Sequence, residues 1–425
     1  MSKAKVIAGI DIGSSKVSTL IAQFNKEEEK ISIVGVSSVD SKGVRKGQIV
    51  DIDEASSAVI NSVESAERMA GYSLDHAFVT IGGGHIESKN SHGVVAVSYP
   101  SGEIGPGDVD RVIDAARAMS MPESREILHV IPREYKVDGE TQVKDPEGMS
   151  GVRLEVQTHL ITGSSTAAKN ITKCISEAGI VPDGLVFSGL ASSFSVLTDT
   201  EKELGVVLID IGGGTTSITA FVEGAIIHSS VFPIGGKNVT NDIAAGLRIS
   251  LESAEKLKVT LSNPKKKVSE DLETEDDLDM TKLGIEDGEK RISQKTLIDG
   301  IIKPRLNEIF TMVAMELSSK GVIGKVPSGV VVTGGCALCI GTQESARRML
   351  SLPARIGFPK GVTGLIEEVE NPAFAACVGL LFFGITEQET APKWTSTGIF
   401  SKIGKDLPVK GAVGKFSDLF KKLLP

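Results

Sequence analysis

Two short segments of the chain place an aspartate at the end of an apolar run and follow it with a glycine turn. The first reads Asp11-Ile12-Gly13-Ser14-Ser15-Lys16, and the second reads Asp210-Ile211-Gly212-Gly213-Gly214-Thr215-Thr216. Glycines let backbone N–H groups approach phosphate oxygens closely, and hydroxyl and ammonium groups add further donors. The carboxylates of Asp11 and Asp210 can hold a magnesium ion through water. Together, the two segments predict a site that grips a polyphosphate from both sides.

The two segments are copies of one pattern, separated by 199 residues. In each copy a β-branched apolar run precedes the aspartate, and small hydroxyl residues and a second apolar run follow the glycines. This order predicts a strand, a tight turn and a second strand. A hairpin repeated at this distance indicates two similar domains that face each other. An ordinary glycine hairpin is the alternative for the first copy taken alone.

Two later features have residue types suited to contacting a nucleoside. Glu255 and Lys258 lie three residues apart, on one face of a predicted helix over 241–261, where they can bond ribose hydroxyls. Gly334 and Gly335 follow a short apolar run, so a flat base can approach the backbone there. Each feature alone also fits a purely structural role, such as a surface ion pair.

The order of these motifs resembles that of the actin-like ATPase superfamily. That superfamily has a first phosphate hairpin, a connecting helix, a second phosphate hairpin, an adenosine motif and a second connecting helix. The corresponding segments are 9–16, 190–197, 208–216, 333–335 and 371–379. The resemblance implies an α/β fold of two lobes built from duplicated ribonuclease-H-like domains. It also implies ATP and Mg²⁺ as cofactors, bound in the cleft between the lobes.

Further segments are similar to the FtsA family, the bacterial cell-division actin homologues. They are ILHVIPREY at 127–135, DPEGM at 145–149, GVRLEV at 151–156, EKELG at 201–205 and AGLR at 245–248. This resemblance implies a small α+β insert subdomain within the first lobe. The implied domains are a first lobe at 1–83 and 163–204, to which 371–386 returns; the insert at 84–162; a second lobe at 205–370, with a nucleotide-side subdomain at 237–323; a flexible linker at 387–414; and an amphipathic membrane helix at 415–425.

Local patterns predict the elements between the motifs. Alternating apolar residues predict strands at 77–81, 94–97, 127–131, 135–137 and 154–160. Helical periodicity predicts helices at 109–119, begun by Asp108, at 166–178 and at 296–319, with Pro304 interrupting or kinking the last one. The segment from Glu270 to Glu289 holds ten acidic residues and one Lys, which favours a solvated, partly disordered loop.

The last eleven residues predict a helix that lies on a membrane. Its apolar face consists of Phe416, Leu419, Phe420 and Leu423, at positions i, i+3, i+4 and i+7, and Lys415, Lys421 and Lys422 flank this face. A long polar linker precedes the helix, which a helix docked on its own protein does not need. The flanking positive charge fits an anionic lipid surface. The alternative is that the helix packs on the protein's own body.

The family resemblance implies a role in cell division. FtsA proteins bind ATP, polymerise, tether the FtsZ ring to the cytoplasmic face of the cell membrane at the septum, and recruit later division proteins. The resemblance places the C-terminal peptide of FtsZ on the 237–323 subdomain, where Arg305 is a candidate contact. The alternative is a phosphotransferase of the same superfamily that acts on a small sugar or acid. Such a kinase needs a substrate-side carboxylate near the cleft and no amphipathic tail.

One position departs from the pattern of filament-forming relatives. In relatives such as MreB, an acidic residue precedes the first connecting helix and helps to position the attacking water. The corresponding residue here is Ser188, which cannot act as a general base at neutral pH. We therefore expect slow hydrolysis at most, with ATP acting mainly as a structural and assembly ligand.

Composition excludes several classes of function. The 425 residues carry a net charge of −9, which argues against broad nonspecific binding to nucleic acid. No stretch of 18 residues is predominantly apolar, so we expect any membrane contact to be peripheral. Cys336 and Cys339 form a CxxC motif, which is compatible with redox chemistry or half of a zinc site. Small residues surround both cysteines, so simple core packing is the favoured interpretation.

Overall fold

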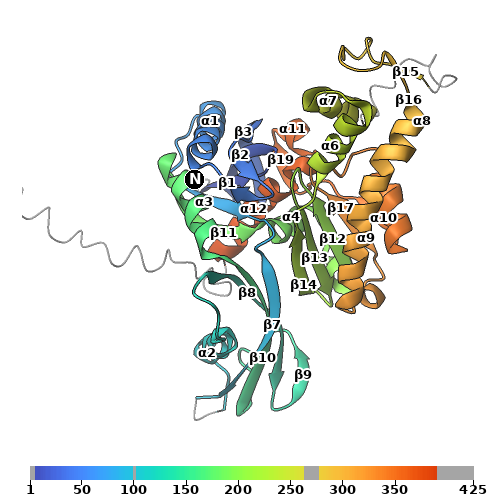
Figure 1. Cartoon of the computed structure of the whole chain (residues 1–425). Helices are drawn as coiled ribbons and strands as arrows, with labels where there is room; N and C mark the ends of the chain where they lie inside the picture. Colours follow the sequence, from blue (N-terminus) through green and yellow to red (C-terminus); the bar gives the residue numbers. More distant parts are fainter. Residues whose placement is uncertain (1–4, 99–101, 263–276, 390–425) are drawn as a thin grey trace, which may run out of the picture.

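The computed structural model describes residues 5–98, 102–262 and 277–389. Two lobes stand side by side and a smaller unit extends below them (Figure 1). The first lobe contains a six-stranded sheet in the order β11-β6-β1-β2-β3-β19. Its strands are β1 (Lys5–Ile12), β2 (Lys16–Asn25), β3 (Lys30–Asp40), β6 (His76–Ile81), β11 (Val181–Phe187) and β19 (Val362–Gly364), with a separate small pair β4 (Val44–Arg45) and β5 (Gln48–Ile49). Its helices are α1 (Ile52–Ala70) and α3 (Ser165–Glu177).

The second lobe contains a five-stranded sheet in the order β14-β13-β12-β17-β18. Its strands are β12 (Val206–Ile211), β13 (Thr216–Val222), β14 (Ala225–Phe232), β17 (Val330–Thr333) and β18 (Ala354–Ile356). Its longer helices are α6 (Gly236–Leu247), α7 (Leu251–Ser262), α9 (Lys303–Ser319) and α10 (Thr342–Leu350). Shorter elements are α5 (Asp199–Leu204), α8 (Gln294–Leu297), the π-helix η3 (Ile298–Ile302) and the 3₁₀ turn η4 (Ile323–Lys325).

The two lobes repeat one arrangement of strands, as the duplicated sequence pattern predicts. In each lobe an antiparallel hairpin, β1–β2 or β12–β13, pairs on one side with a parallel strand, β6 or β17. A third antiparallel strand, β3 or β14, follows on the other side. Even the turn is the same: Gly13 N–H donates to the Lys16 carbonyl at 3.0 Å, and Gly212 N–H to the Thr215 carbonyl at 2.8 Å. The aspartates at these strand ends therefore occupy equivalent positions.

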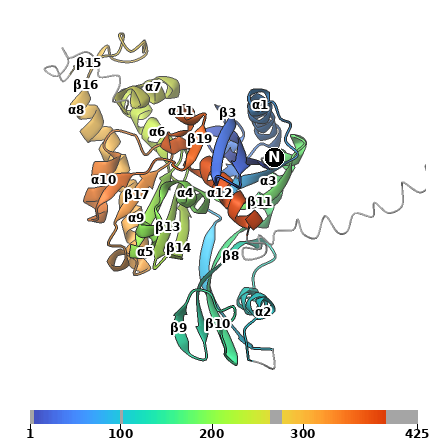
Figure 2. The ribbon, with the colours of Figure 1, turned by 180° about the vertical axis from the view of Figure 1, so that it is seen from behind.

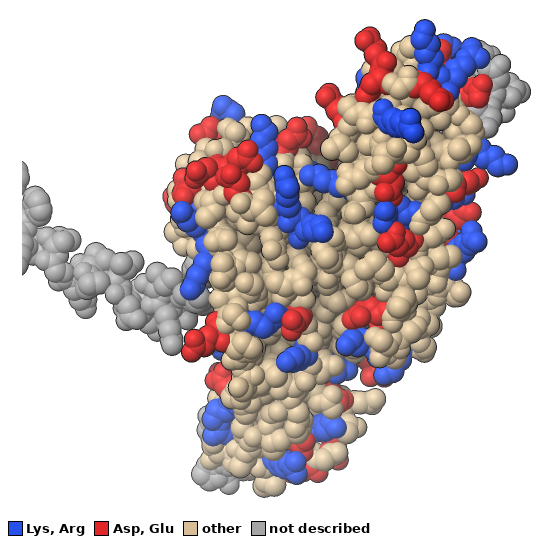
Figure 3. Space-filling model, in the orientation of Figure 1, with Lys and Arg blue, Asp and Glu red and all other residues tan. Residues whose placement is uncertain are grey.

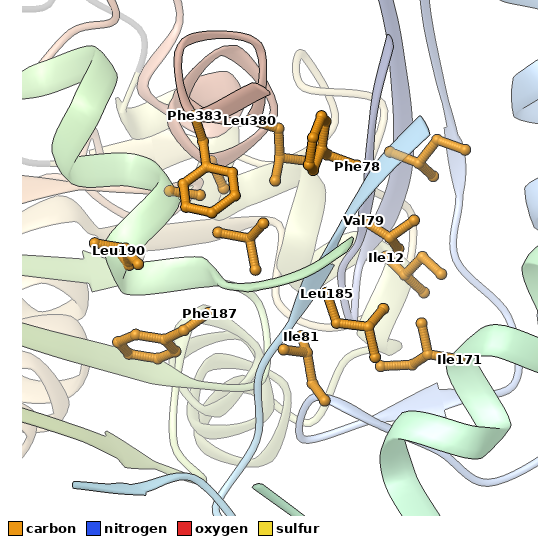
Figure 4. Close-up of a cluster of buried hydrophobic side chains, with 14 of the residues drawn as sticks. Ile12, Phe78, Val79, Ile81, Ile171, Leu185, Phe187, Leu190, Leu380 and Phe383 are labelled. Carbon is orange, nitrogen blue, oxygen red and sulfur yellow. The ribbon is translucent and has the colours of Figure 1, made fainter. Parts of the chain in front are cut away.

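Two helices cross between the sheets and join the lobes (Figure 2). They are α4 (Ser188–Val196) and α12 (Ala375–Glu389), which is preceded by a 3₁₀ turn, η5 (Pro372–Phe374), and the short α11 (Ile366–Val369). A Cβ at Gly379 would collide with the backbone of Ala191, so only glycine permits this close crossing. Phe383 of α12 makes edge-on ring contacts with Phe78, Phe194 and His129, and Figure 4 shows it in this apolar cluster.

The insert is a four-stranded sheet with one helix packed against it. Its strands, in the order β7-β10-β8-β9, are β7 (Glu87–Ala96), β10 (Arg153–Ser164), β8 (Arg125–Val137) and β9 (Glu140–Val143). Helix α2 (Pro106–Arg117) begins three residues earlier than the sequence predicts. Asp108 does not precede the helix but lies in its first turn, where its carboxylate accepts from the N–H groups of Gly105 and Ser98. This pattern is typical of the return half of a capping box.

The insert also contacts the second lobe. Ser88 on β7 donates to the Ser229 carbonyl on β14 at 2.7 Å and accepts from the Ser229 N–H at 3.1 Å. His159 on β10 is buried and bonds the Ser229 hydroxyl through Nε2 and the Asn90 amide through Nδ1. Burial lowers the pKa of His159 to about 3, so the ring is neutral at pH 7. The insert, which interrupts the chain of the first lobe, is therefore also bonded to β14 of the second lobe.

Besides α2, three predicted elements differ from what the structure shows. The helix predicted over 241–261 is two helices, because Arg248 adopts a left-handed conformation with φ of 57° between α6 and α7. The helix predicted over 296–319 continues through Pro304, which stands in the first turn of α9 directly after the wider turns of the π-helix η3.

The third difference concerns the acidic segment, of which the structure describes residues 277–289. Here β15 (Asp277–Asp279) pairs with β16 (Arg291–Ser293), and Leu278, Met280 and Ile285 are buried in the core of the second lobe. Asp287 accepts from the N–H of Ser250 at 2.6 Å and from the hydroxyl of Ser253. The buried apolar residues and the bonds of Asp287 thus hold residues 277–289 against the second lobe beside α7.

Candidate functional site

A cavity of about 620 Å³ lies between the two hairpins and extends to α6 and α7. The predicted site residues that line it are Asp11, Gly13, Ser14, Ser15, Lys16, Asp210, Gly212, Gly213, Thr215, Glu255, Lys258, Gly334 and Gly335. Gly214 is not in the cavity wall. The structure thus brings predicted residues of four separate segments together around one cavity.

The partly buried carboxylates of Asp11 and Asp210 both line the cavity and lie close enough to interact. Asp11 accepts a hydrogen bond from the Thr80 hydroxyl at 2.7 Å, and Asp210 accepts one from the Ser192 hydroxyl at 2.6 Å. Burial raises the pKa of Asp11, and burial together with repulsion from Asp11 raises the pKa of Asp210 to about 6, against the lowering effect of Ser192. Each carboxylate thus has few donors for a buried negative charge. This is the chemistry of a site that can hold a hydrated divalent cation.

The turns of the two hairpins touch across the cleft. A Cβ at Gly213 would collide with Ser15, and one at Gly214 would collide with Ser14. The Ser14 hydroxyl is fixed in turn by the Gly47 N–H at 2.8 Å. The triple glycine is therefore needed for contact between the lobes as well as for access by a ligand. Because Gly214 packs against Ser14 of the other hairpin, it lies at this contact and not in the cavity wall.

Two lysines in the cavity carry the positive charge nearest the hairpins. Lys16 places its ammonium 3.4 Å from the centre of the Phe374 ring, and burial lowers its pKa despite the nearby Asp11. Lys237, at the start of α6, donates its ammonium to the Ser14 carbonyl at 2.5 Å. The Lys237 backbone N–H donates to the Gly213 carbonyl at 2.8 Å. Lys237 therefore bonds both hairpins, one through its side chain and one through its backbone.

Helices α6 and α7 form another part of the cavity wall. The Lys258 ammonium donates to Glu255 at 2.7 Å, to the Thr240 hydroxyl at 2.9 Å and to the Gly236 carbonyl at 3.3 Å. Thr240 in turn donates to Glu255. Glu255 is still half exposed, so its carboxylate can accept from ribose hydroxyls. The pair is thus a fixed wall of the cavity and not a mobile surface ion pair.

The glycine turn after β17 closes the opposite wall. Gly334 has φ of 90°, a conformation that favours glycine, and a Cβ there would collide with Asp210 and Ile211. Gly335 has open space on its Cα side, with Ala373 the nearest side chain at 3.8 Å from a Cβ built there. A flat base can therefore approach the backbone at Gly335, as the sequence predicts.

Ser188 begins α4 and lines the cavity below the hairpins. Its hydroxyl lies 3.2 Å from the Ser217 hydroxyl on β13, so it links the lobes. No carboxylate occupies this position, and the acids in the cavity wall are Asp11, Asp40, Asp210, Glu252 and Glu255. Of these five, Asp11 and Asp210 belong to the two hairpins.

Several residues of the site are absent from the sequence prediction. Thr80 and Ser192 position the two aspartates, and Lys237 and Thr240 line the cavity from α6. The dipeptide Gly235-Gly236 before Lys237 is a signal that points to a close backbone approach there. Thr80 and Ser192 carry no such signal, because no local pattern distinguishes them from the other hydroxyl residues of the chain.

The remaining predicted residues have different surroundings. Arg305 binds Asp242 of α6 with two bonds, from Nε at 2.5 Å and from Nη2 at 2.9 Å, and also pairs with Glu308. Its guanidinium thus joins α9 to α6, and an acidic peptide must compete with these carboxylates. The four cysteines are buried and free, and the described residues contain no cluster that can hold zinc. The predicted membrane residues 415–425 lie outside the described residues, among which no helix is long and apolar enough to cross a bilayer.

Comparison with protein families gives two matches along the chain. Residues 83–162 match the family described as "SHS2 domain inserted in FTSA", and residues 207–379 match "Cell division protein FtsA". Cell division protein FtsA from Pseudomonas aeruginosa is 38% identical over 398 residues, which cover 94% of each chain. The FtsA proteins of Bacillus subtilis and Escherichia coli K12 are 37% and 34% identical, over 90% and 89% of this chain and 84% and 90% of their own lengths.

Solved structures of low sequence identity share the fold. The chain described as "PilM-PilN type IV pilus biogenesis complex" matches with a TM-score of 0.63 at 16% identity, over 89% of this chain and 98% of that chain. MreB5 of Spiroplasma citri, solved bound to ADP, matches with a TM-score of 0.53 at 14% identity, over 92% of this chain and 99% of that chain. These likenesses support the actin-like arrangement of two lobes described above.

Proposed function

The chain belongs to the FtsA family of cell division proteins, and we propose that it binds Mg·ATP between its lobes, polymerises, and tethers the FtsZ ring to the membrane. One observation carries the nucleotide part of this proposal. Two equivalent hairpins, each with a partly buried aspartate near the end of its first strand, face the same cavity of about 620 Å³. This volume lies within the range that is typical of pockets for small molecules.

The residues of the cavity divide into groups by what they would contact. The turn N–H groups and hydroxyls at Ser14, Ser15 and Thr215 face the phosphate end, together with Lys16 and Lys237. Asp11 and Asp210 would hold Mg²⁺ through its waters, and the ion would neutralise phosphate charge. Glu255 and Lys258 would contact the ribose, and the backbone at Gly335 would face the base. A bound nucleotide would thus touch both lobes and favour their closed arrangement.

Hydrolysis is proposed to be slow. Ser188 lies where an acid would have to orient water, and its hydroxyl is engaged with Ser217. We expect phosphate release far below the median enzyme turnover of about 10 per second. Release near that rate would show that another group acts as the base. Membership of a cell-division family favours this assignment over the phosphotransferase alternative.

Membrane attachment is proposed through the amphipathic segment 415–425. Its short apolar face would bind weakly as a single copy, and a filament with many copies would bind much more strongly. The proposal therefore couples polymerisation to attachment. The FtsZ peptide is proposed to bind the 237–323 subdomain, where Arg305 would exchange its partners Asp242 and Glu308 for the peptide's carboxylates.

Cosedimentation with vesicles tests the coupled proposal. The full chain and a chain that lacks 415–425 are mixed with anionic vesicles, with and without Mg·ATP. We expect the full chain to pellet with vesicles, and more strongly with Mg·ATP, while the shortened chain stays in solution under both conditions. Pelleting of the shortened chain would place the membrane contact elsewhere. A full chain that pellets equally with and without Mg·ATP would contradict the link between nucleotide and attachment.

A further inference from the structure

The proposed function leaves one pair of reactive side chains in the cavity wall unused. Cys336 lines the cavity, and Cys339 follows three residues later in the loop between β17 and α10. Both are almost fully buried, at 4% and 7% exposure. The two thiols are close enough for each to shift the pKa of the other.

The backbone between them fits a disulfide. The Cys339 N–H donates to the Cys336 carbonyl at 3.0 Å, which closes a turn. Such a turn brings its first and fourth Cα atoms within about 7 Å. Disulfides usually span Cα separations of about 4.4–6.8 Å. The bond can therefore form within the loop, without displacing β17 or α10.

The surroundings favour a thiolate at Cys339, whereas the interaction with Cys339 and burial raise the pKa of Cys336. The hydrogen bond from Cys336 lowers the pKa of Cys339, and the nearby ammonium of Lys258 and the hydroxyl of Ser262 act in the same direction. The other two cysteines are isolated. Cys377 donates to backbone carbonyls of the first lobe, and burial raises its pKa, as it does for Cys174. Reactive cysteines are typically found near positive charge, and inert ones in apolar surroundings.

We propose that Cys336 and Cys339 form a redox-active dithiol, and that its disulfide lowers the affinity of the cavity for nucleotide. The second part rests on the proposed function. Cys336 directly follows the Gly334-Gly335 turn, and its sulfur packs against Gly236, whose carbonyl accepts from Lys258. Closing the bond draws the two sulfur atoms to a separation of about 2.05 Å. That movement shifts the wall that would contact the base and ribose.

The reaction is an ordinary thiol–disulfide exchange with a small disulfide that enters the cavity. A thiolate of the pair attacks one sulfur of the reagent, and the reagent's S–S bond breaks with release of one thiolate. The second cysteine loses its proton and attacks the mixed disulfide, and the second reagent thiolate leaves. The protein gives up two electrons and two protons, and the reagent becomes two thiols. A reducing dithiol reverses the sequence.

Cystamine is the probe for the test. The full chain is treated with cystamine with and without Mg·ATP, and peptide mapping by mass spectrometry locates the bond that forms. Calorimetry then measures Mg·ATP affinity before and after treatment, and again after reduction. Cys336→Ser removes the cavity-facing thiol with little change of volume, and Cys174→Ser is the matched control at an isolated buried cysteine. Each variant is compared with itself before and after cystamine.

We expect a Cys336–Cys339 bond that forms more slowly when Mg·ATP is present. Affinity for Mg·ATP should fall about tenfold or more, the equivalent of losing one contact worth about 1.4 kcal/mol. Reduction should restore it, Cys174→Ser should behave like the unaltered chain, and Cys336→Ser should keep its own affinity after treatment. Failure of the bond to form in the folded chain, when the urea-unfolded chain forms it, overturns the dithiol. A bond that leaves affinity unchanged overturns its effect on nucleotide. If neither redox form binds Mg·ATP, the proposed function fails with that effect, while the peptide map still decides the dithiol.

Discussion

Asp11 and Asp210 are partly buried carboxylates that repel one another and accept from one side-chain hydroxyl each. A hydrated cation between them would relieve this repulsion and connect them to phosphate. Asp210→Asn keeps the size and the bond from Ser192 but removes the charge. We expect Mg·ATP affinity to fall at least about tenfold, or 1.4 kcal/mol, in calorimetry. Asp110→Asn, at an exposed position of α2, should leave affinity unchanged. Equal affinities for all three chains would contradict the paired-hairpin site.

His129 links the insert to α4, because its Nε2 accepts the Phe187 N–H at 3.0 Å. Burial lowers the pKa of His129 to about 3, below the ordinary value of 6.5. The unfolded chain therefore binds the proton first as pH falls, and stability conferred by the neutral ring is present above about pH 6.5 and lost between 6.5 and 3. We expect a loss of about 2 kcal/mol by pH 5 from this group.

His129→Gln tests this because glutamine keeps an acceptor and does not titrate. Thermal midpoints at pH 7.5 and pH 5 should differ less for His129→Gln than for the unaltered chain. His76→Gln is the matched control, since His76 is exposed and pairs with Asp183 at the surface. It should retain the full difference. An unchanged pH dependence in His129→Gln would mean that His129 is not the titrating group.

At the residue scale, the sequence predicts the groups that a ligand would touch better than the groups that hold them. Asp11, Asp210 and the glycines follow apolar strands in a repeated pattern, and that repetition is what makes them visible. Thr80 and Ser192 act only through contacts across 69 and 18 residues. Such pairing depends on tertiary structure, so no local spacing reveals it. The bonds of Arg305 to Asp242 are equally invisible in the sequence, since the two residues lie 63 positions apart.

At the scale of elements, the two hairpins form one unit because Lys237 joins them. Its ammonium bonds the Ser14 carbonyl and lines the cavity, so phosphate would meet it directly. Lys237→Met keeps the length of the side chain and removes the charge. We expect Mg·ATP affinity to weaken by about 1.5–3 kcal/mol, the typical strength of a hydrogen bond to a charged group.

Lys237→Arg should retain most of the affinity, because it keeps a cationic donor at the same place. Lys256→Met on the neighbouring helix α7 is the matched control, since Lys256 bonds the Gly284 carbonyl on the outer side. It should bind Mg·ATP like the unaltered chain. A fluorescent nucleotide analogue reports all four affinities. If Lys237→Met binds normally, Lys237 only holds the hairpins together.

Local patterns predict where elements occur, and tertiary contacts decide where they break. Periodicity continues through Arg248, yet the chain turns there because α7 must pack beside α6 and receive Asp287 at its first turn. The acidic segment contains too many charges for an obvious strand, and its few apolar residues suffice to bury β15 and β16. Composition averages over such residues, so it predicts a loop. Glycine turns need no such correction, because their conformation is local.

At the scale of the whole molecule, three features connect the lobes around the cavity. Helices α4 and α12 cross at Gly379, Lys237 spans the hairpins, and the insert reaches β14 through Ser88 and His159. A change in the angle between the lobes would therefore alter the contacts between the insert and β14. Charged groups of both signs are interspersed over the face in Figure 3, which does not favour one broad electrostatic contact. This face therefore gives no alternative to the proposed attachment through segment 415–425.

Phe420 lies near the centre of the apolar face in that segment. Phe420→Glu places a charge where the helix would enter the acyl boundary, and it should weaken vesicle binding by several kcal/mol. Phe420→Leu keeps an apolar side chain and should still bind.

Lys421→Glu with Lys422→Glu should weaken binding to anionic vesicles and have little effect on neutral ones, because these residues act through charge alone. Cosedimentation measures all of these. The thermal midpoint and Mg·ATP affinity of Phe420→Glu should match those of the unaltered chain, since the cavity lies in the two lobes. If Phe420→Glu still pellets with vesicles, or melts at a lower temperature, the segment packs on the protein and does not attach it to a membrane.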